Sequence, residues 1–352
     1  LGAKLVDFAG WEMPVQYPAG ILKEHNQCRG AAALFDVSHM GQALVRGPDA
    51  AGAFERLVPG NVRGLGEGRI RYTMFTNDRG GILDDLMVAN AGDGTLYVVV
   101  NAGGRDDDLA HMRAHLEPAG CAVEELADRA LIALQGPAAE TVLARFAPAA
   151  EDLPFMGTAG MEVTGIPCRV SRSGYTGEDG FEISVAAADA VTLARRLLDE
   201  PEVAPAGLGA RDSLRLEAGL CLYGHDIDAT TTPVEAGLTW TIAKRRRDEG
   251  GFPGAEVIRR QLADGPPRKL VGLRPEGRAP AREHSEIRSR DGDRIGGVTS
   301  GGFGPTAGGP IAMGYVEAAH AAPGTPVQLV VRGKAHPAVV VELPFVPHRY
   351  KR

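Results

Sequence analysis

Three runs of strand-forming residues, separated by two short turns, constrain the fold of this chain more than any other feature. The runs cover residues 71–76, 82–90 and 95–101, and the turns cover 77–80 and 91–94. The second turn contains Asp-Gly, which is a strong hairpin signal between apolar runs. We therefore expect three antiparallel strands in sequence order.

Helical and strand patterns alternate after these strands. Apolar residues at helical spacing predict helices, and short apolar runs between turns predict strands. The expected helices cover 105–115, 138–146, 187–198 and 210–219, and the expected strands cover 130–134, 161–170 and 181–185. A chain that mixes strands and helices in this way indicates an α+β fold.

The pattern changes after a polar, glycine-rich segment. Residues 244–254 (KRRRDEGGFPG) form the best candidate linker. Its basic run at 244–247 indicates a solvated surface or, alternatively, a docking patch for an acidic partner. The strands expected beyond it cover 270–273, 295–299, 313–316, 326–331 and 338–343. Short strands at this spacing are typical of a small β barrel or sandwich.

Charge, hydropathy and cysteine usage exclude several functional classes. The net charge of −7 argues against a nucleic-acid partner, because phosphate binding needs a basic face. No run of 18 apolar residues is present, so we expect no membrane span. The cysteines form no Cys-x-x-Cys pair, so no zinc site is indicated, and a reducing compartment is expected. The chain starts at Leu1 rather than at Met, and we expect residues before it.

Sequence motifs for several cofactors are missing. Residues 64–68 (GLGEG) lack the glycine spacing of a dinucleotide fingerprint, and no phosphate loop or His-Glu-x-x-His occurs. No Gly-x-Ser-x-Gly nucleophile motif occurs either. We therefore expect no metal, flavin or nicotinamide.

Asp84 and Asp85 follow the turn at 77–80 and stand next to each other on an expected strand. Adjacent strand residues point to opposite faces, so one carboxylate faces inward, where an unpaired charge is costly. For the pair alone, a turn cap or an ion pair is the favoured interpretation. The alternative is chemistry: a carboxylate that bonds an amine or stabilises developing positive charge.

Glu182 and Arg211 are candidate binding groups. Glu182 lies between Phe181 and Ile183 and so faces the other side of its strand. A carboxylate accepts two hydrogen bonds side by side from a cyclic amidine edge, as in a pterin, although most glutamates on strands are simply exposed. Arg211 has the chemistry to clamp a carboxylate or stack on a ring, or it belongs to a surface network with Arg215.

Together, six blocks resemble the T-protein family of the glycine cleavage system over essentially the whole chain. The blocks are 8–17 (FAGWEMPVQY), 34–40 (LFDVSHM), 76–86, 174–182, 210–228 and 312–316 (AMGYV). The resemblance implies a three-domain cloverleaf around a central folate site. Its domains are a Greek-key antiparallel sheet (1–38 with 135–148 and 175–243), a ferredoxin-like domain (39–134 with 149–174) and a C-terminal jelly-roll-like β barrel (250–352).

The resemblance also implies an activity. Members transfer the methylene of the aminomethyl group on the lipoyl arm of H-protein to tetrahydrofolate, releasing ammonia and giving 5,10-methylenetetrahydrofolate. Lipoylated H-protein and folate are thus the expected partners. Alternatives within the same fold are a folate-dependent demethylase and a non-catalytic folate-binding assembly or regulatory protein. The Lys-Gly-Cys-Tyr signature of the non-catalytic class is missing from the sequence. The expected location is the cytoplasm for a bacterial source, which composition favours, or the mitochondrial matrix for a eukaryotic one.

The resemblance assigns site residues by position. Asp85 matches the family's key carboxylate near the reacting methylene, Glu182 matches the pterin anchor, and Arg211 matches the folate-binding arginine. Tyr350 matches the C-terminal tyrosine at the substrate site. The expected pocket walls are Met40, Tyr72, Val99, Asn101 and Trp240.

Overall fold

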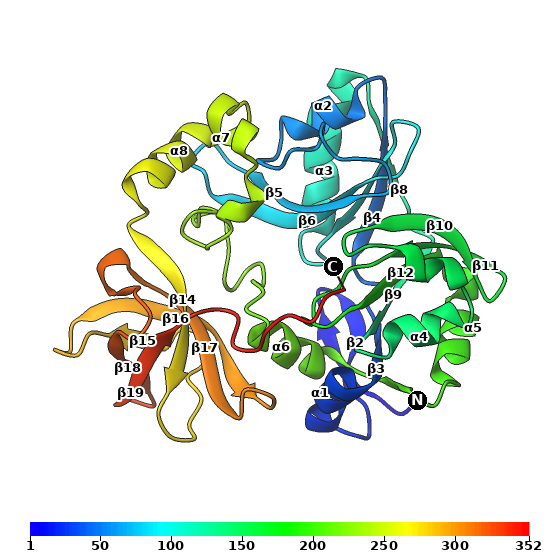
Figure 1. The fold of residues 1–352 in the computed structure, drawn as a ribbon. Helices are drawn as coiled ribbons and strands as arrows, with labels where there is room; N and C mark the ends of the chain where they lie inside the picture. Colours follow the sequence, from blue (N-terminus) through cyan, green and yellow to red (C-terminus); the bar gives the residue numbers. More distant parts are fainter. Residues whose placement is uncertain (352) are drawn as a thin grey trace. The chain divides into compact units, whose positions relative to one another are not determined.

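The computed structural model describes residues 1–351, and the chain forms two compact units. The first unit comprises residues 1–75, 84–211 and the chain from Arg349 on, and the second comprises residues 76–83 and 212–348. Figure 1 labels helices and strands of each unit. No helix within residues 1–351 combines the length and the apolar character needed to cross a membrane.

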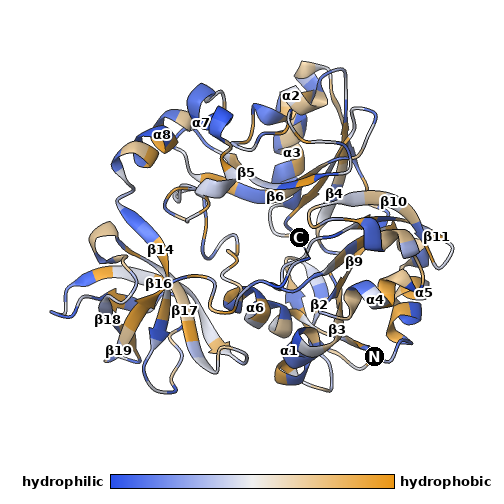
Figure 2. Cartoon of the chain, in the orientation of Figure 1, coloured by the Kyte–Doolittle hydropathy of each residue, from blue (hydrophilic) through white to orange (hydrophobic). Residues whose placement is uncertain are grey.

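A six-stranded sheet forms one half of the first unit. Its order is β10 (Thr158–Val163), β11 (Ile166–Ser171), β12 (Gly180–Ala186), β9 (Arg129–Gln135), β3 (Ala32–Asp36) and β13 (Val203–Pro205). The pairs are antiparallel except β13 with β3. Helices α1 (Ile21–Gly30), α4 (Ala139–Ala144) and α5 (Ala187–Leu198) pack on its strands. In Figure 2, α5 carries both hydrophobic and hydrophilic residues, and its buried Leu193 and Leu197 join Phe181 and Ile183 in the core.

A five-stranded sheet forms the other half of the first unit. Its order is β5 (Ile70–Thr76), β6 (Ile82–Asn90), β7 (Leu96–Val100), β4 (Gly41–Arg46) and β8 (Ala122–Glu125). Helix α3 (Arg105–Leu116) contacts β8 and α2 (Ala50–Glu55). The three strands expected from the opening pattern are therefore neighbours in sequence order. A separate hairpin pairs β1 (Lys4–Phe8) with β2 (Trp11–Gln16).

Strand pairing bears on where the domains divide. The boundaries proposed from the sequence assign residues 129–134 and 158–171 to the same domain as 39–100. In the structure those strands, β9, β10 and β11, pair in one sheet with β3 and β12. The division into three domains stays a prediction, and this pairing favours moving both segments to the first domain.

A closed six-stranded barrel dominates the second unit. Its order is β14 (Arg268–Pro275), β17 (Gly309–Glu317), β16 (Arg294–Gly304), β15 (Glu286–Arg288), β18 (Pro326–Val331) and β19 (Lys334–Val341). Alternate residues such as Leu273, Ile287, Leu329 and Val340 fill its interior. The α+β class and the C-terminal barrel expected from the sequence are confirmed.

The segment expected as a linker is instead partly helical. Residues 244–249 form α7 (Lys244–Glu249), followed by α8 (Ala255–Asp264). The basic run is also not a uniformly solvated face. Arg246 is buried against Phe252, while Arg245 pairs with Glu249 one turn later. Local ion pairs and ring stacking therefore order a stretch whose composition resembles a loop.

The remaining helices are short or link the larger elements. They are α6 (Leu208–Glu217) and the 3-10 turns η1 (Glu117–Ala119), η2 (Pro148–Asp152), η3 (Thr239–Thr241) and η4 (Ala318–His320).

Candidate active site

Three adjacent strands of the five-stranded sheet bring Tyr72, Asp85 and Asn101 together. Tyr72 lies on β5, Asp85 on β6, and Asn101 directly follows β7. The Tyr72 hydroxyl donates to Oδ2 of Asp85 at 2.8 Å, and the Asn101 amide donates to Oδ1 at 2.8 Å. Both carboxylate oxygens therefore have a fixed donor, which holds the group in one orientation.

The environment of Asp85 favours its neutral form more than water does. Burial, followed by the charge of Asp84, raises the pKa of Asp85 to about 7. The hydrogen bonds from Tyr72 and Asn101 oppose that shift without cancelling it. A carboxyl group with this pKa changes charge near neutral pH and is thus suited to acid–base or electrostatic work.

Asp84 is the more deeply buried of the two carboxylates. Its side chain is 1% exposed, whereas Asp85 is only partly buried. Oδ1 of Asp84 accepts hydrogen bonds from the Asn101 amide and the Asp85 backbone N–H, each at 2.8 Å. The sequence places the two on opposite faces of a strand, and the structure shows that the face of Asp84 is the interior.

Glu182 projects from β12 on the side opposite the core residues Phe181 and Ile183. Its Oε2 accepts a hydrogen bond from the Ser173 hydroxyl at 2.5 Å. Burial raises the pKa of Glu182, while the Ser173 bond and the charge of Arg211 act in the opposite direction. The carboxylate is therefore enclosed and close to a cation, as a binding group for a polar ring edge needs to be.

Arg211 lies on α6 and stacks on an aromatic ring. Its guanidinium carbon is 4.5 Å from the centre of the Tyr175 ring. Its charge also acts on His39, whose pKa is lowered to about 4, first by burial and then by Arg211. Arg215, one turn later, follows the structural alternative instead, because it pairs with Asp212 and with the buried Asp226.

The C-terminal segment is tied to the first unit. The Tyr350 ring stacks on Phe155 with centroids 4.3 Å apart. Next to it, Arg349 pairs with Glu178 at 2.5 Å and its backbone N–H bonds Gly177 at 2.8 Å. Glu178 is 1% exposed and also pairs with Arg29, so one buried carboxylate anchors both guanidinium groups. The tail is thus ordered, as its aromatic residues indicate.

The other expected wall residues are less closely linked to this group. Val99 packs with Tyr97 and Ala89 in a hydrophobic cluster of the five-stranded sheet, and Met40 is partly buried in the turn after β3. Trp240 belongs to the second unit, in η3, and its side chain is 65% exposed.

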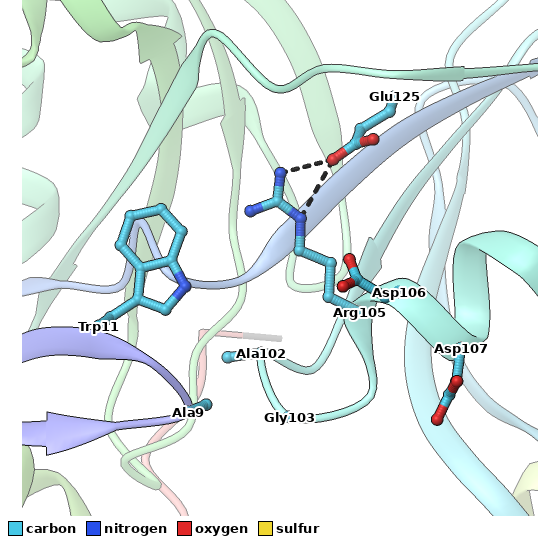
Figure 3. Close-up of a pocket in the computed structure, with 8 residues that line it drawn as sticks. All are labelled: Ala9, Trp11, Ala102, Gly103, Arg105, Asp106, Asp107 and Glu125. Atoms are coloured by element: carbon cyan, nitrogen blue, oxygen red, sulfur yellow. Dashed lines mark hydrogen bonds and ion pairs between the residues drawn. The ribbon is translucent and has the colours of Figure 1, made fainter.

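A cavity of about 560 Å³ lies beside Ala102 and Gly103, directly after Asn101 (Figure 3). Trp11 lies on one side of it, and the ion pair of Arg105 with Glu125 lies on the other. None of the site residues expected from the sequence lines it. Within residues 1–351, no group of three or more His, Cys, Asp or Glu side chains is placed to hold a metal ion.

Two family profiles match the chain. The GCVT N-terminal domain covers residues 1–246, and the glycine cleavage T-protein C-terminal barrel domain covers residues 268–347. The chain belongs to the glycine cleavage T-protein family. Within that family it is similar to curated relatives and to a solved structure along its whole length.

The mitochondrial aminomethyltransferase of Gallus gallus is 51% identical over 357 residues, covering 99% of this chain and 90% of the relative. The mitochondrial aminomethyltransferase of Dictyostelium discoideum is 48% identical over 369 residues, covering 100% and 91%. The crystal structure of glycine cleavage system aminomethyltransferase T from Bartonella henselae superimposes with a TM-score of 0.94 at 44% identity, covering 100% and 96%.

Several polar and aromatic partners of these residues were not named individually from the sequence. Ser173 and Tyr175 belong to the glycine-rich segment before β12, whose unusual composition and, for Tyr175, the resemblance of residues 174–182 are their signals. Phe155 stands in an irregular stretch without a pattern. Asp108 lies in the acidic first turn of α3, where acidic residues ordinarily complement the helix dipole.

Proposed function

We propose that the group around Asp85 carries out folate-dependent aminomethyl transfer. The chain is an aminomethyltransferase of the glycine cleavage system, and the proposal concerns which residues perform the reaction. The single observation that supports it best is the Asp85 carboxyl group, held by Tyr72 and Asn101 with a pKa of about 7. At neutral pH, a fraction of the protein molecules carries a negative charge on this group. That charge would stabilise the positive charge that develops as ammonia departs.

In the proposed reaction, two bonds to the methylene carbon break and two form. The carbon–sulfur and carbon–nitrogen bonds of the S–CH2–NH2 group on lipoylated H-protein break, and the methylene joins N5 and N10 of tetrahydrofolate. The two protons lost from N5 and N10 go to the released ammonia and to the dihydrolipoyl thiol. Asp85 orients the folate and stabilises positive charge as ammonia departs.

Glu182 and Arg211 have the chemistry that tetrahydrofolate requires. Glu182, with Ser173 behind it, accepts hydrogen bonds from the amidine edge of the pterin ring. Arg211, stacked on Tyr175, supplies positive charge for a folate carboxylate. Tyr350, Met40, Val99 and Trp240 are proposed as walls of the substrate site. We propose that the protein is located in the cytoplasm if its source is a bacterium and in the mitochondrial matrix if its source is a eukaryote.

An ammonia-release assay tests the proposal. Aminomethyl-loaded H-protein is mixed with the full chain, with and without tetrahydrofolate. We expect rapid ammonia release that depends on tetrahydrofolate and on Asp85. Tetrahydrofolate binding without any increase in ammonia release would instead favour a non-catalytic folate-binding protein.

A further inference from the structure

Asp84 and Asp108 form a buried carboxyl pair beneath the proposed catalytic group. Asp84 on β6 is 1% exposed and Asp108 on α3 is 4% exposed. Oδ2 of each is buried and has no hydrogen-bond partner within residues 1–351. Both Oδ2 atoms lie within 3.5 Å of the position that a Cβ atom of residue 104 would take. Because two ionised carboxylates are both acceptors and repel each other, neighbouring buried carboxyl groups with these two oxygens unpartnered favour a proton between them.

The local backbone leaves room for this pair. A Cβ atom at Gly104 would lie 2.2 Å from Oδ2 of Asp84 and 3.5 Å from Oδ2 of Asp108. A side chain at residue 104 would therefore displace the Asp84 carboxyl group. Gly104 precedes the first turn of α3, so the same glycine starts the helix and accommodates the pair.

Charges around the pair favour its protonated form. Burial and then the charge of Asp84 raise the pKa of Asp108 to about 9, and Asp85 and Asp107 act in the same direction. Burial also raises the pKa of Asp84, although hydrogen bonds from Asn101, Asp108 and Asp85 oppose the shift. One proton shared by two carboxyl groups is the usual solution for such a pair.

We propose that Asp84 and Asp108 share one proton at neutral pH and act as positioning residues for Asp85. This inference rests on the catalytic role proposed above for Asp85. The same Asn101 amide bonds Asp84 at 2.8 Å and Asp85 at 2.8 Å, so the position of Asp84 fixes the donor on which Asp85 depends. The pair also holds a single negative charge next to Asp85, which, after burial, raises the pH range in which Asp85 ionises.

Asp108→Asn is the central variant. Its amide can donate to ionised Asp84 in place of the shared proton, so the charge of the pair at neutral pH stays the same. We expect kcat within about threefold of the parent. In the parent, the pair should lose its shared proton near pH 9, which adds a second negative charge beside Asp85 and should lower kcat. Asp108→Asn should lack this alkaline decline, and an unchanged decline would overturn the proposal.

Two further variants separate position from charge. Asp84→Asn with Asp108→Asn removes the charge, so the acid limb assigned to Asp85 should move down by about one pH unit. Gly104→Ala displaces Asp84 and should lower kcat at least tenfold, leaving the Kd for tetrahydrofolate unchanged. An acid limb that stays in place, or full activity in Gly104→Ala, would contradict the positioning role.

Infrared spectroscopy tests the shared proton without any activity. An Asp85→Asn/Glu182→Gln protein at neutral pH should show a protonated-carboxyl C=O band that shifts in D2O, and adding Asp108→Asn should remove it. If the transfer assay fails but the band behaves in this way, the proposed function is wrong and the proton pair stands. A band absent before Asp108 is changed, or unaffected by that change, overturns the pair itself.

Discussion

Asp85 illustrates how far one carboxylate depends on its neighbours. Asp85→Asn keeps the size of the side chain and the acceptor for Tyr72 or Asn101, so we expect the fold and the Kd for tetrahydrofolate to be retained. The negative charge is lost, and kcat should fall about 10²- to 10⁴-fold. Steady-state ammonia release together with calorimetry of folate binding checks both parts. Activity close to that of the parent would remove Asp85 from the mechanism.

The pKa of Asp85 gives a pH dependence with a definite sign. Because the pKa is raised to about 7, the ionised form accumulates only as the pH rises through 7. We expect kcat to increase across that range and to level before the alkaline decline expected near pH 9. The stability effect has the opposite direction: the folded protein holds this proton more tightly than the unfolded chain, so this site loses stabilisation between about pH 4 and pH 7. Rate profiles and urea unfolding at each pH measure the two.

Glu182 is expected to act in binding rather than in chemistry. Glu182→Ala removes a carboxylate that would accept charge-assisted hydrogen bonds from the pterin ring. This change should weaken tetrahydrofolate binding about 10- to 100-fold. Glu12→Ala, on the exposed face of β2, serves as the matched control and should leave the affinity unchanged. Isothermal titration with tetrahydrofolate measures the affinity of each variant. Equal affinities for the two variants would exclude Glu182 as the anchor of the pterin ring.

Between single residues and the whole chain, the most informative element is the C-terminal segment with its anchor. Glu178→Gln removes the buried carboxylate with which the mostly buried Arg29 pairs, which should cost about 3–5 kcal/mol of unfolding free energy. Arg349 is half exposed, so Arg349→Ala should cost less than about 1 kcal/mol. Yet Arg349→Ala should raise the KM severalfold, because Tyr350 then loses its neighbouring anchor. Urea unfolding and steady-state kinetics separate these effects, and an unaltered KM would argue against a role for the tail.

At the scale of the whole molecule, substrate binding should appear as added stability. Tetrahydrofolate at one hundred times its Kd should stabilise the folded chain by about 2.7 kcal/mol, or about 2–4 °C in the thermal midpoint. Asp85→Asn should keep this shift, and Glu182→Ala, with its Kd raised 10- to 100-fold, should reduce it to about 0.4–1.4 kcal/mol at the same concentration. Differential scanning calorimetry measures both, and an equal shift in the two variants would contradict the division of roles.

The same scale shows what could be predicted from the sequence. The meander of β5, β6 and β7 and five of the six barrel strands follow from alternation and turn chemistry, and the length of α5 follows from helical spacing. The three-residue strand β15 is too short to leave such a pattern. The placement of β9, β10 and β11 in one sheet with β3 could not be predicted, because pairing between distant segments leaves no local pattern in the sequence. Likewise, Asp108 resembles an ordinary helix-start residue, and only the fold reveals that its carboxyl group lies with that of Asp84 beside Gly104.

The placement of the two tryptophans makes the chain a convenient subject for fluorescence. Trp11 borders the cavity in Figure 3 and is 42% exposed, while Trp240 lies in η3 of the second unit and is 65% exposed. Each compact unit thus contains a single indole emitter. Trp240→Phe leaves a reporter for the first unit alone, and Trp11→Phe leaves one for the second. The unfolding of each unit can then be followed in the intact chain with no added dye.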